Sequence, residues 1–193
     1  MDIDRRHEIP IPAAAIDRTE SFLLNLFGAI FFALLTVLSA QIRIPLPFTP
    51  IPMTLQTFIV PLAGGFLGLR WGIASMLLYL SFGLLDVNAF AAASRGAQFV
   101  FAPSAGYLVG FVFAAAIMGW SRDHKFGNGA MFAALVIANV MIFVCGMIGL
   151  MINTSMSALE AWYRGVAPFL PGGAIKLAAS YLTLTSYRVM RRQ

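Results

Sequence analysis

Charged side chains, cysteine and histidine are all scarce in this sequence of 193 residues. Only 11% of the residues are charged, and the one cysteine is Cys145. A single cysteine excludes an internal disulfide or a cluster of thiolate ligands around one metal ion. The two histidines, His7 and His124, lie in polar segments, so an intramembrane hydrolase would lack the base or metal ligands that it needs. The sequence therefore predicts neither an enzyme nor a metal site.

Groups that couple transport to an energy source are also missing. All eight acidic residues lie outside the long apolar runs, whereas proton- or sodium-driven pumps usually hold an Asp or Glu within a helix. The chain has no G-x-x-x-x-G-K-[ST] phosphate-binding loop, so we do not expect it to use ATP itself. A transport protein of this composition would take its energy from a partner, or would act as a passive channel.

Hydrophobic sequence is what the chain has in abundance. Hydrophobic residues make up 60% of it, and the mean hydropathy is +0.83. Because about 20 apolar residues cross a bilayer as a helix, these values indicate an all-α integral membrane protein with six transmembrane helices. We expect a cytoplasmic leader at residues 1–20 and one membrane domain at 21–193. The expected spans are 21–40, 55–69, 71–85, 103–120, 129–152 and 167–187.

The distribution of positive charge predicts the orientation of the chain. Six spans place both termini on one side of the membrane. That side would carry nine Lys and Arg residues: Arg5, Arg6, Arg18, Arg70, Arg122, Lys125, Arg188, Arg191 and Arg192. The other side would carry three, namely Arg43, Arg95 and Arg164. Because cytoplasmic loops hold the excess of positive charge, both termini are expected in the cytoplasm.

Four prolines interrupt the sequence between the first two expected spans. They lie at positions 45, 47, 50 and 52 of the segment 41–54, QIRIPLPFTPIPMT, which we call the proline-rich loop. Proline removes a backbone donor and restricts the residue before it, so this segment is not a helix. Its other side chains are too apolar for an ordinary solvated loop. Two interpretations remain open: a lid or plug over a site, or a loop that lies in the membrane interface.

Lys176 is the one full charge in an otherwise apolar and small-residue stretch, 168–180. An ammonium in a bilayer costs about 2.5–3.5 kcal/mol on insertion scales, so an intramembrane lysine indicates a functional site. Gly172 and Ala179 share its helical face and leave room beside it. An anionic ligand is its natural partner, and Arg43, Arg95 and Arg164 would steer such an anion from outside. The alternatives are a lysine that snorkels to the interface and arginines that are plain surface charge.

Pairs of small residues four positions apart recur in the expected spans. They include Ala29/Ala33, Gly64/Gly68, Gly68/Gly72 and Gly106/Gly110. Such pairs let helices approach closely where lipid gives no hydrophobic drive for association. Most of them would pack this protein's own bundle. Ala29 and Ala33 could equally pack against another membrane protein.

Several segments resemble the BioY family, the biotin-specific S components of energy-coupling-factor transporters. The resemblance extends over residues 27–183, and its most specific piece is IPLPFTPIPMTLQTF at 44–58. Supporting pieces are LYLSFGLL (78–85), APSAGYLVGF (102–111) and FLPGGAIK (169–176). The resemblance implies a six-helix, non-enzymatic protein of the bacterial plasma membrane that binds biotin beneath its outer loops. It also implies a transmembrane coupling protein and two ATPase subunits as partners, with ATP used only by them and with no cofactor or nucleic acid.

The resemblance implies site residues as well. Lys176 matches the sixth-helix lysine of the biotin site, and Ala29 and Ala33 match the small residues that contact the coupling protein. The further substrate-binding candidates are Arg43, Phe48, Gln56, Asn88, Phe90, Ser94, Arg95, Tyr107 and Gly173. Gly173 stands where the family usually has an acid facing the polar ring of biotin, and Asn88 or Ser94 would have to replace that acid. The third outer loop, FAAASRG at 90–96, and the start of the fourth helix, APSAGY, also depart from the usual motifs.

Three hypotheses follow from the sequence. In the first, the chain captures biotin at the outer face for uptake that a partner ATPase module drives. In the second, it is an S component for another small anionic heterocyclic vitamin. In the third, it is a facilitator that moves biotin without a partner.

Overall fold

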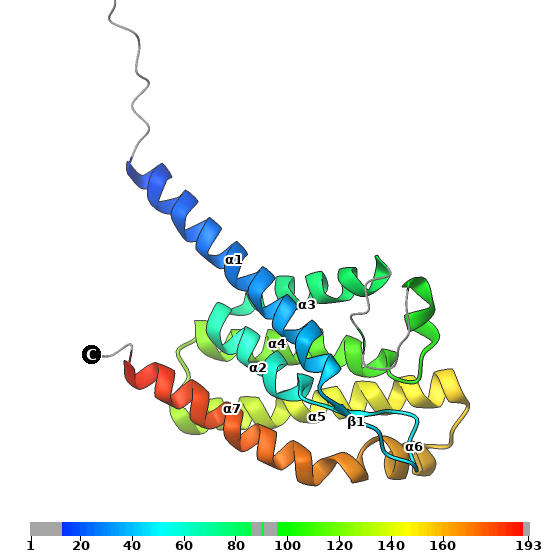
Figure 1. The fold of residues 1–193 in the computed structure, drawn as a ribbon. Helices are drawn as coiled ribbons and strands as arrows, with labels where there is room; N and C mark the ends of the chain where they lie inside the picture. Colours follow the sequence, from blue (N-terminus) through cyan, green and yellow to red (C-terminus); the bar gives the residue numbers. More distant parts are fainter. Residues whose placement is uncertain (1–12, 86–89, 91–95, 191–193) are drawn as a thin grey trace, which may run out of the picture.

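Long helices make up most of the computed structural model, which describes residues 13–85, 90 and 96–190, with side chains in 20–85, 90 and 98–190. In these parts of the chain six helices have 12 or more residues (Figure 1). They are α1 (Ala13–Gln41), α2 (Gln56–Leu67), α3 (Leu69–Leu84), α4 (Ala105–Asp123), α5 (Asn128–Thr154) and α7 (Leu170–Met190). The prediction of an all-α protein with six long helices is therefore confirmed. The first helix begins at Ala13, earlier than the expected residue 21.

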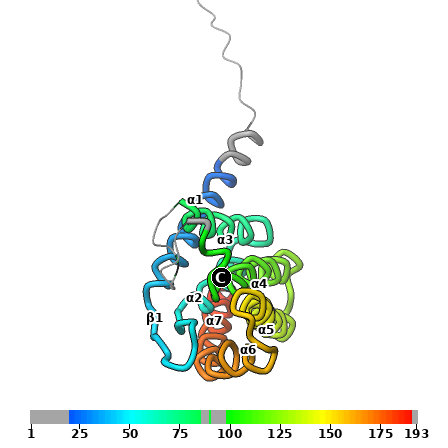
Figure 2. Tube along the Cα trace, turned by 90° about the vertical axis from the view of Figure 1, so that its right-hand side faces the viewer, coloured from blue at the N-terminus to red at the C-terminus, as the bar shows by residue number. Residues whose placement is uncertain are grey.

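α1 begins and α7 ends at the same end of the bundle (Figure 1). In the described residues three helices are long and apolar enough to cross a membrane: Glu20–Gln41, Ala105–Asp123 and Asn128–Thr154. α2 and α3 are apolar but shorter, and α7 is not among the three although it has 21 residues. Seen at right angles to the first view, α4 and α5 lie side by side and α1 runs along the edge of the bundle (Figure 2).

Glycine allows α4 and α5 to lie in backbone contact. A Cβ added to Gly106 of α4 would overlap the carbonyl oxygen of Cys145 and would lie 2.9 Å from the Gly149 Cα on α5. A second close approach joins α2 and α4, where a Cβ at Gly64 would overlap the Ala115 carbonyl oxygen. These glycines therefore pack the protein's own bundle, as their spacing of four with other small residues predicts.

A single residue, Gly68, separates α2 from α3. Its φ of +86° lies in a region that L side chains rarely adopt, so glycine suits this sharp connection. The Asp123 carboxylate at the end of α4 accepts a hydrogen bond of 2.9 Å from the Leu69 backbone N–H, the first of α3. The start of α3 is thereby capped by a side chain that is distant in sequence.

The connections between the long helices contain short elements that the sequence patterns above do not predict. In the proline-rich loop, β1 (Arg43–Ile44) pairs antiparallel with β2 (Met53–Thr54). The segment 153–166, expected to be only a polar connection, contains the helix α6 (Ala158–Gly165). The 3-10 helices η1 (Gly96–Phe101) and η2 (Ala167–Phe169) precede α4 and α7.

A capping box explains where α6 begins. The Ser157 hydroxyl accepts from the Glu160 backbone N–H at 3.3 Å, and the Glu160 carboxylate accepts from the Ser157 backbone N–H at 3.1 Å. This S-x-x-E pattern is a known signature of helix starts, and it is legible in the sequence. The hydrogen bonds from the Ser157 amide and hydroxyl also lower the pKa of the Glu160 carboxyl.

Candidate functional site

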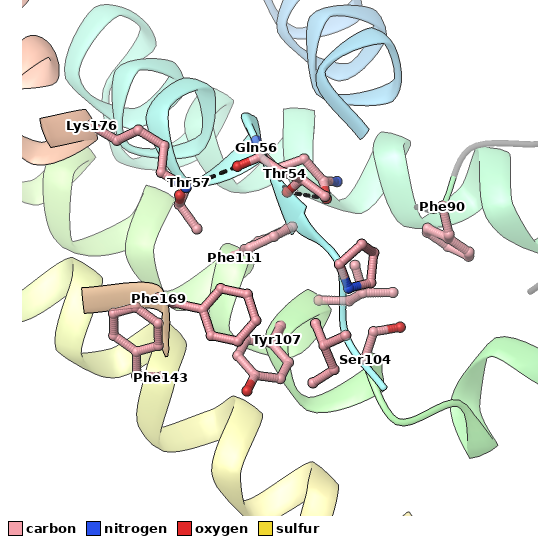
Figure 3. Close-up of a pocket in the computed structure, with 13 residues that line it drawn as sticks. Thr54, Gln56, Thr57, Phe90, Ser104, Tyr107, Phe111, Phe143, Phe169 and Lys176 are labelled. Carbon is pink, nitrogen blue, oxygen red and sulfur yellow. Dashed lines mark hydrogen bonds between the residues drawn. The ribbon is translucent and has the colours of Figure 1, made fainter. Parts of the chain in front are cut away.

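A pocket lies between the proline-rich loop and the helix ends on the same side of the bundle (Figure 3). Its walls come from the proline-rich loop, the start of α2, α4, α5, η2 and α7, with Phe90 from the connection after α3. The lining residues are Ile51, Pro52, Thr54, Gln56, Thr57, Phe90, Ser104, Tyr107, Leu108, Phe111, Phe143, Phe169 and Lys176. Most of this lining is apolar and aromatic, with a few polar groups, as is usual for small-molecule sites.

Among the described residues, Lys176 supplies the one charged group of the lining. Its Nζ donates a hydrogen bond of 2.9 Å to the Thr54 carbonyl oxygen, which joins α7 to β2 of the proline-rich loop. A Cβ added at Gly172, one turn earlier, would lie 2.9 Å from the Met53 Sδ, so the glycine lets β2 approach α7. The ammonium is thus held at the wall of the pocket by a neutral carbonyl, and no carboxylate pairs with it among the described residues.

Gln56 anchors a polar chain behind this wall. Its amide Nε2 donates to the Tyr79 hydroxyl at 2.6 Å, and its Oε1 accepts from the Thr54 hydroxyl at 3.1 Å. Both Gln56 and Tyr79 are buried. Because its polar groups are occupied within the protein, Gln56 fixes the position of Thr54 and so of the carbonyl that holds Lys176.

Thr57 presents a hydroxyl with unused hydrogen-bonding capacity. The Oγ1 atom is buried and has no hydrogen-bond partner among the described residues. A buried polar atom without a partner costs about 1–3 kcal/mol, so such a group in a pocket wall is a candidate for ligand contact. Thr57 lies in the first turn of α2, just after Thr54 at the end of β2.

Aromatic rings form the apolar side of the pocket. Phe90 contacts Tyr79 edge to face, with ring centroids 5.4 Å apart. The Tyr107 hydroxyl donates to the Gly165 carbonyl oxygen at 2.6 Å, and its ring covers Gly146. The hydrogen bond therefore ties the wall of the pocket to the end of α6.

The structure brings four of the predicted substrate-binding residues together around this pocket: Gln56, Phe90, Tyr107 and Lys176. Gly173 is close by but does not line it, and an added Cβ there would lie 3.7 Å from the Phe143 Cζ. Three others, Asn88, Ser94 and Arg95, lie outside the described residues. The ligand-binding roles of all these residues remain predictions.

Phe48 and Arg43 lie on the outside of the proline-rich loop. Phe48 is 56% exposed and borders a wide depression that Tyr163 and Arg164 also border. Arg43 is exposed on β1. Neither residue lines the pocket, because both precede the part of the loop, from Ile51 to Thr54, that turns inward.

Sequence reasoning missed several residues of the lining. Thr54 and Thr57 flank the predicted Gln56, so the motif at 44–58 could have identified them. Phe143 and Phe169 lie in apolar stretches where no chemical feature distinguishes a pocket residue from a core residue. Only the packing of the helices shows that these rings meet the pocket.

Ala29 and Ala33, the residues expected to contact a partner, lie inside the fold of this chain. Both residues have 0% exposure, and α1 packs against α2 and α3. Spacing of four predicts close helix approach but does not say which helix approaches. The neighbouring Gly28 lies close to α2, because a Cβ added there would lie 2.6 Å from the Leu67 side chain. Contact of Ala29 and Ala33 with a coupling protein stays a prediction.

Comparison with known proteins identifies the family. A sequence profile of the BioY family matches residues 15–193. The chain belongs to the BioY family. This membership confirms the resemblance noted in the sequence, and BioY chains are membrane transport components, so the prediction that the protein is not an enzyme is also confirmed.

Individual BioY proteins show the same relationship. The biotin transporter BioY of Thermotoga maritima is 31% identical over 82% of this chain and 92% of its own length. The probable biotin transporter BioY of Pyrococcus horikoshii is 30% identical over 78% and 88%. The probable biotin transporter BioY of Lysinibacillus sphaericus is 42% identical, but that match spans 52% of this chain and 50% of the relative.

A solved structure shares the fold. The S-component for biotin from an ECF-type ABC transporter superposes with a TM-score of 0.79, covering 90% of this chain and 94% of that one. The two sequences are 22% identical. The same arrangement of helices is therefore kept although most side chains differ.

Proposed function

We propose that this chain binds biotin in the pocket beneath the proline-rich loop and hands it to an ATP-driven partner for uptake. The observation that carries the proposal is the position of the Lys176 ammonium in the wall of an otherwise aromatic pocket in a BioY chain. A carboxylate on the ligand would accept a charge-assisted hydrogen bond from Nζ, which is about twice as strong as a neutral one. The apolar body of biotin would contact Phe90, Tyr107 and Phe143.

The pocket would have to widen to admit the ligand. Its free volume is about 60 Å³. Small-molecule sites usually enclose about 300–1,000 Å³. The Lys176–Thr54 hydrogen bond closes the wall at one point, so exchange of the Thr54 carbonyl for the ligand's carboxylate would free the inner part of the proline-rich loop to move. This supports the interpretation of the loop as a lid rather than a passive interfacial segment.

The ring end of the ligand would meet a site that differs from the usual family pattern. Gly173 offers no side-chain acceptor, and its neighbour is the Phe143 ring. Among the described residues that line the pocket, Thr57 has a buried hydroxyl without a hydrogen-bond partner, and this hydroxyl would bind a ureido group instead. Because of this difference, a second candidate function is capture of another small anionic heterocyclic vitamin.

The energy for release would come from partner proteins. We place the chain in a bacterial plasma membrane beside a transmembrane coupling protein and two ATPase subunits, as the solved relative belongs to an ECF-type ABC transporter. A coupling protein would meet α1, where Phe27 and Phe31 are exposed beside the buried Ala29 and Ala33. No cofactor is needed for capture.

Binding of labelled biotin to the purified protein tests the proposal. We expect saturable binding that desthiobiotin displaces and lipoate displaces weakly. Stronger displacement by lipoate or by another anionic heterocycle than by biotin would favour the second candidate. No binding of biotin at all would reject the leading one. Uptake in cells that lack coupling proteins would instead indicate a facilitator.

Reporter fusions test the proposed orientation. A fusion in the turn at Arg122–Lys125 should report the cytoplasm, and one at Ser157–Glu160 should report the exterior, because positive charge favours the cytoplasmic side. A fusion after the last residue of α7, Met190, serves as the internal reference for the cytoplasmic side. The opposite result at either loop would contradict an outward-facing pocket.

A further inference from the structure

A second cavity lies at the other end of the bundle, where α4 turns into α5 and α7 ends. Its volume is about 250 Å³. The lining comes from three separate parts of the chain. The end of α4 and the turn after it contribute Arg122, Lys125 and Phe126, α7 contributes Leu184, Tyr187 and Arg188, and α2 contributes Gly65. This cavity shares no residue with the pocket under the proline-rich loop.

Positive charge converges on this cavity. Arg122, Lys125 and Arg188 all line it, and no acidic residue of the part of the chain that the structure describes does. The neighbouring Asp123 is already engaged, since it accepts from the Leu69 backbone N–H at 2.9 Å and lies 3.8 Å from Arg122 Nη1. Three cationic side chains around one hollow attract an anion, so the arrangement favours an anionic ligand.

The backbone around the cavity is held in a defined shape. Arg188 Nη1 donates to the Phe126 carbonyl oxygen at 2.7 Å, which joins the end of α7 to the turn after α4. Lys125 has a φ of +52°, a left-handed conformation that is uncommon for a lysine, and its N–H donates to the Arg122 carbonyl at 2.9 Å. Strained residues of this kind persist where the surroundings fix them, and they occur often at binding sites.

The other walls suit a ligand at a membrane surface. Leu184, Phe126 and Tyr187 give the cavity an apolar side next to its basic side. Tyrosine is enriched at membrane interfaces, and basic hollows between transmembrane helices on the cytoplasmic side bind lipid head groups. The expected orientation places this end of the bundle in the cytoplasmic leaflet.

We propose that the cavity binds a phosphate group, either that of an anionic phospholipid or free phosphate. Arg122 and Arg188 would bind its oxygens through their guanidinium groups, which match phosphate geometry, and Lys125 would add a point charge. The proposal is independent of biotin binding, because the two sites lie at opposite ends of the helices. Occupancy would hold the end of α7 against the turn after α4.

The test uses the purified full chain in detergent with added phosphatidylglycerol, phosphatidylcholine or inorganic phosphate. Native mass spectrometry measures bound lipid, and thermal unfolding measures protection. We expect phosphatidylglycerol to bind and protect, and phosphatidylcholine to do so much less. Lys125→Asn and Arg188→Gln should each weaken phosphatidylglycerol binding by about fivefold, since one interfacial cation contributes about 1 kcal/mol. Asparagine tolerates the left-handed backbone at position 125, so that variant should keep its fold.

Arg70→Gln is the matched control, because Arg70 is exposed at the same end of the bundle and does not line the cavity. It should keep the affinity of the unaltered protein. Protection by inorganic phosphate alone would identify free phosphate as the ligand, and protection by the lipid alone would identify the head group. The proposal is overturned if neither protects, or if Arg70→Gln loses as much affinity as Lys125→Asn, since bulk positive charge would then explain the binding.

Discussion

Replacement of Lys176 by methionine should weaken biotin binding by roughly ten- to a hundredfold. Methionine keeps much of the bulk of the side chain and removes its charge. A hydrogen bond to a charged group contributes about 1.5–3 kcal/mol, and each 1.4 kcal/mol changes affinity tenfold. Lys176→Arg need not restore binding, because the planar guanidinium needs more room than an ammonium and Met53 already lies beside the neighbouring Gly172. Equilibrium binding of labelled biotin to the purified variants measures the effect.

A neutral ligand separates the ion pair from a structural role of Lys176. Biotin amide should bind the unaltered protein poorly and should lose little further affinity in Lys176→Met. If the amide loses as much as biotin does, the lysine acts by holding Thr54 and the proline-rich loop, not by pairing with the carboxylate. A folded Lys176→Met protein that binds biotin normally would contradict the proposed ion pair. Thermal unfolding of both proteins shows whether the fold is kept.

Gly106→Ala should destabilise the fold by about 3 kcal/mol, the upper part of the usual range for overpacking. The added methyl group would overlap the Cys145 carbonyl oxygen, and backbone atoms cannot move aside as a flexible side chain can. α4 and α5 would then have to separate along their contact. Gly106→Leu should prevent the native packing of these helices altogether. Thermal or denaturant unfolding in detergent measures both effects.

Gly129→Ala is the matched control for the effect of a methyl group on a glycine in these helices. Gly129 lies in the first turn of α5, is exposed, and has no atom within 4 Å of an added Cβ. A surface substitution of this kind should change the stability by no more than about 0.5 kcal/mol. Equal losses in the two variants would show that the α4–α5 contact does not depend on the absence of a side chain at Gly106.

The long helices could be predicted because each contains a long, mostly apolar run, and a bilayer demands that such a run satisfy its own backbone. The short elements of the connections could not be predicted in the same way. α6 begins at a capping box that is legible in the sequence, whereas no local pattern marks the pairing of β1 with β2 in a segment rich in proline. The Lys176 hydrogen bond to the Thr54 carbonyl oxygen joins β2 to α7, a contact between residues far apart in the chain.

Gln56, Phe90 and Tyr107 of the candidate pocket were predicted from the family resemblance, whereas chemical reasoning alone predicts a pocket residue only where it is unusual for its surroundings. Lys176 is such a residue, because a charge inside an apolar helix is costly. Phe143 is not, since nothing in the sequence separates it from the rings that pack the core. Ala29 and Ala33 illustrate a related limit. Their spacing predicts a close helix contact but does not name the helix, and the structure shows that both residues are buried within this chain.

The unequal lengths of the helices have a consequence for the surrounding lipid. At 1.5 Å per residue, α1 is about 43 Å long, whereas α2 is about 18 Å and α3 about 24 Å, against a hydrocarbon core of about 30 Å. α1 must therefore tilt or protrude, while the bilayer thins or its head groups descend beside α2 and α3. Such hydrophobic mismatch costs fractions of a kcal/mol per Å. The mismatch with the bilayer therefore differs around the protein, because α1 is longer than the hydrocarbon core and α2 and α3 are shorter. A bilayer with shorter acyl chains would be deformed less beside α2 and α3.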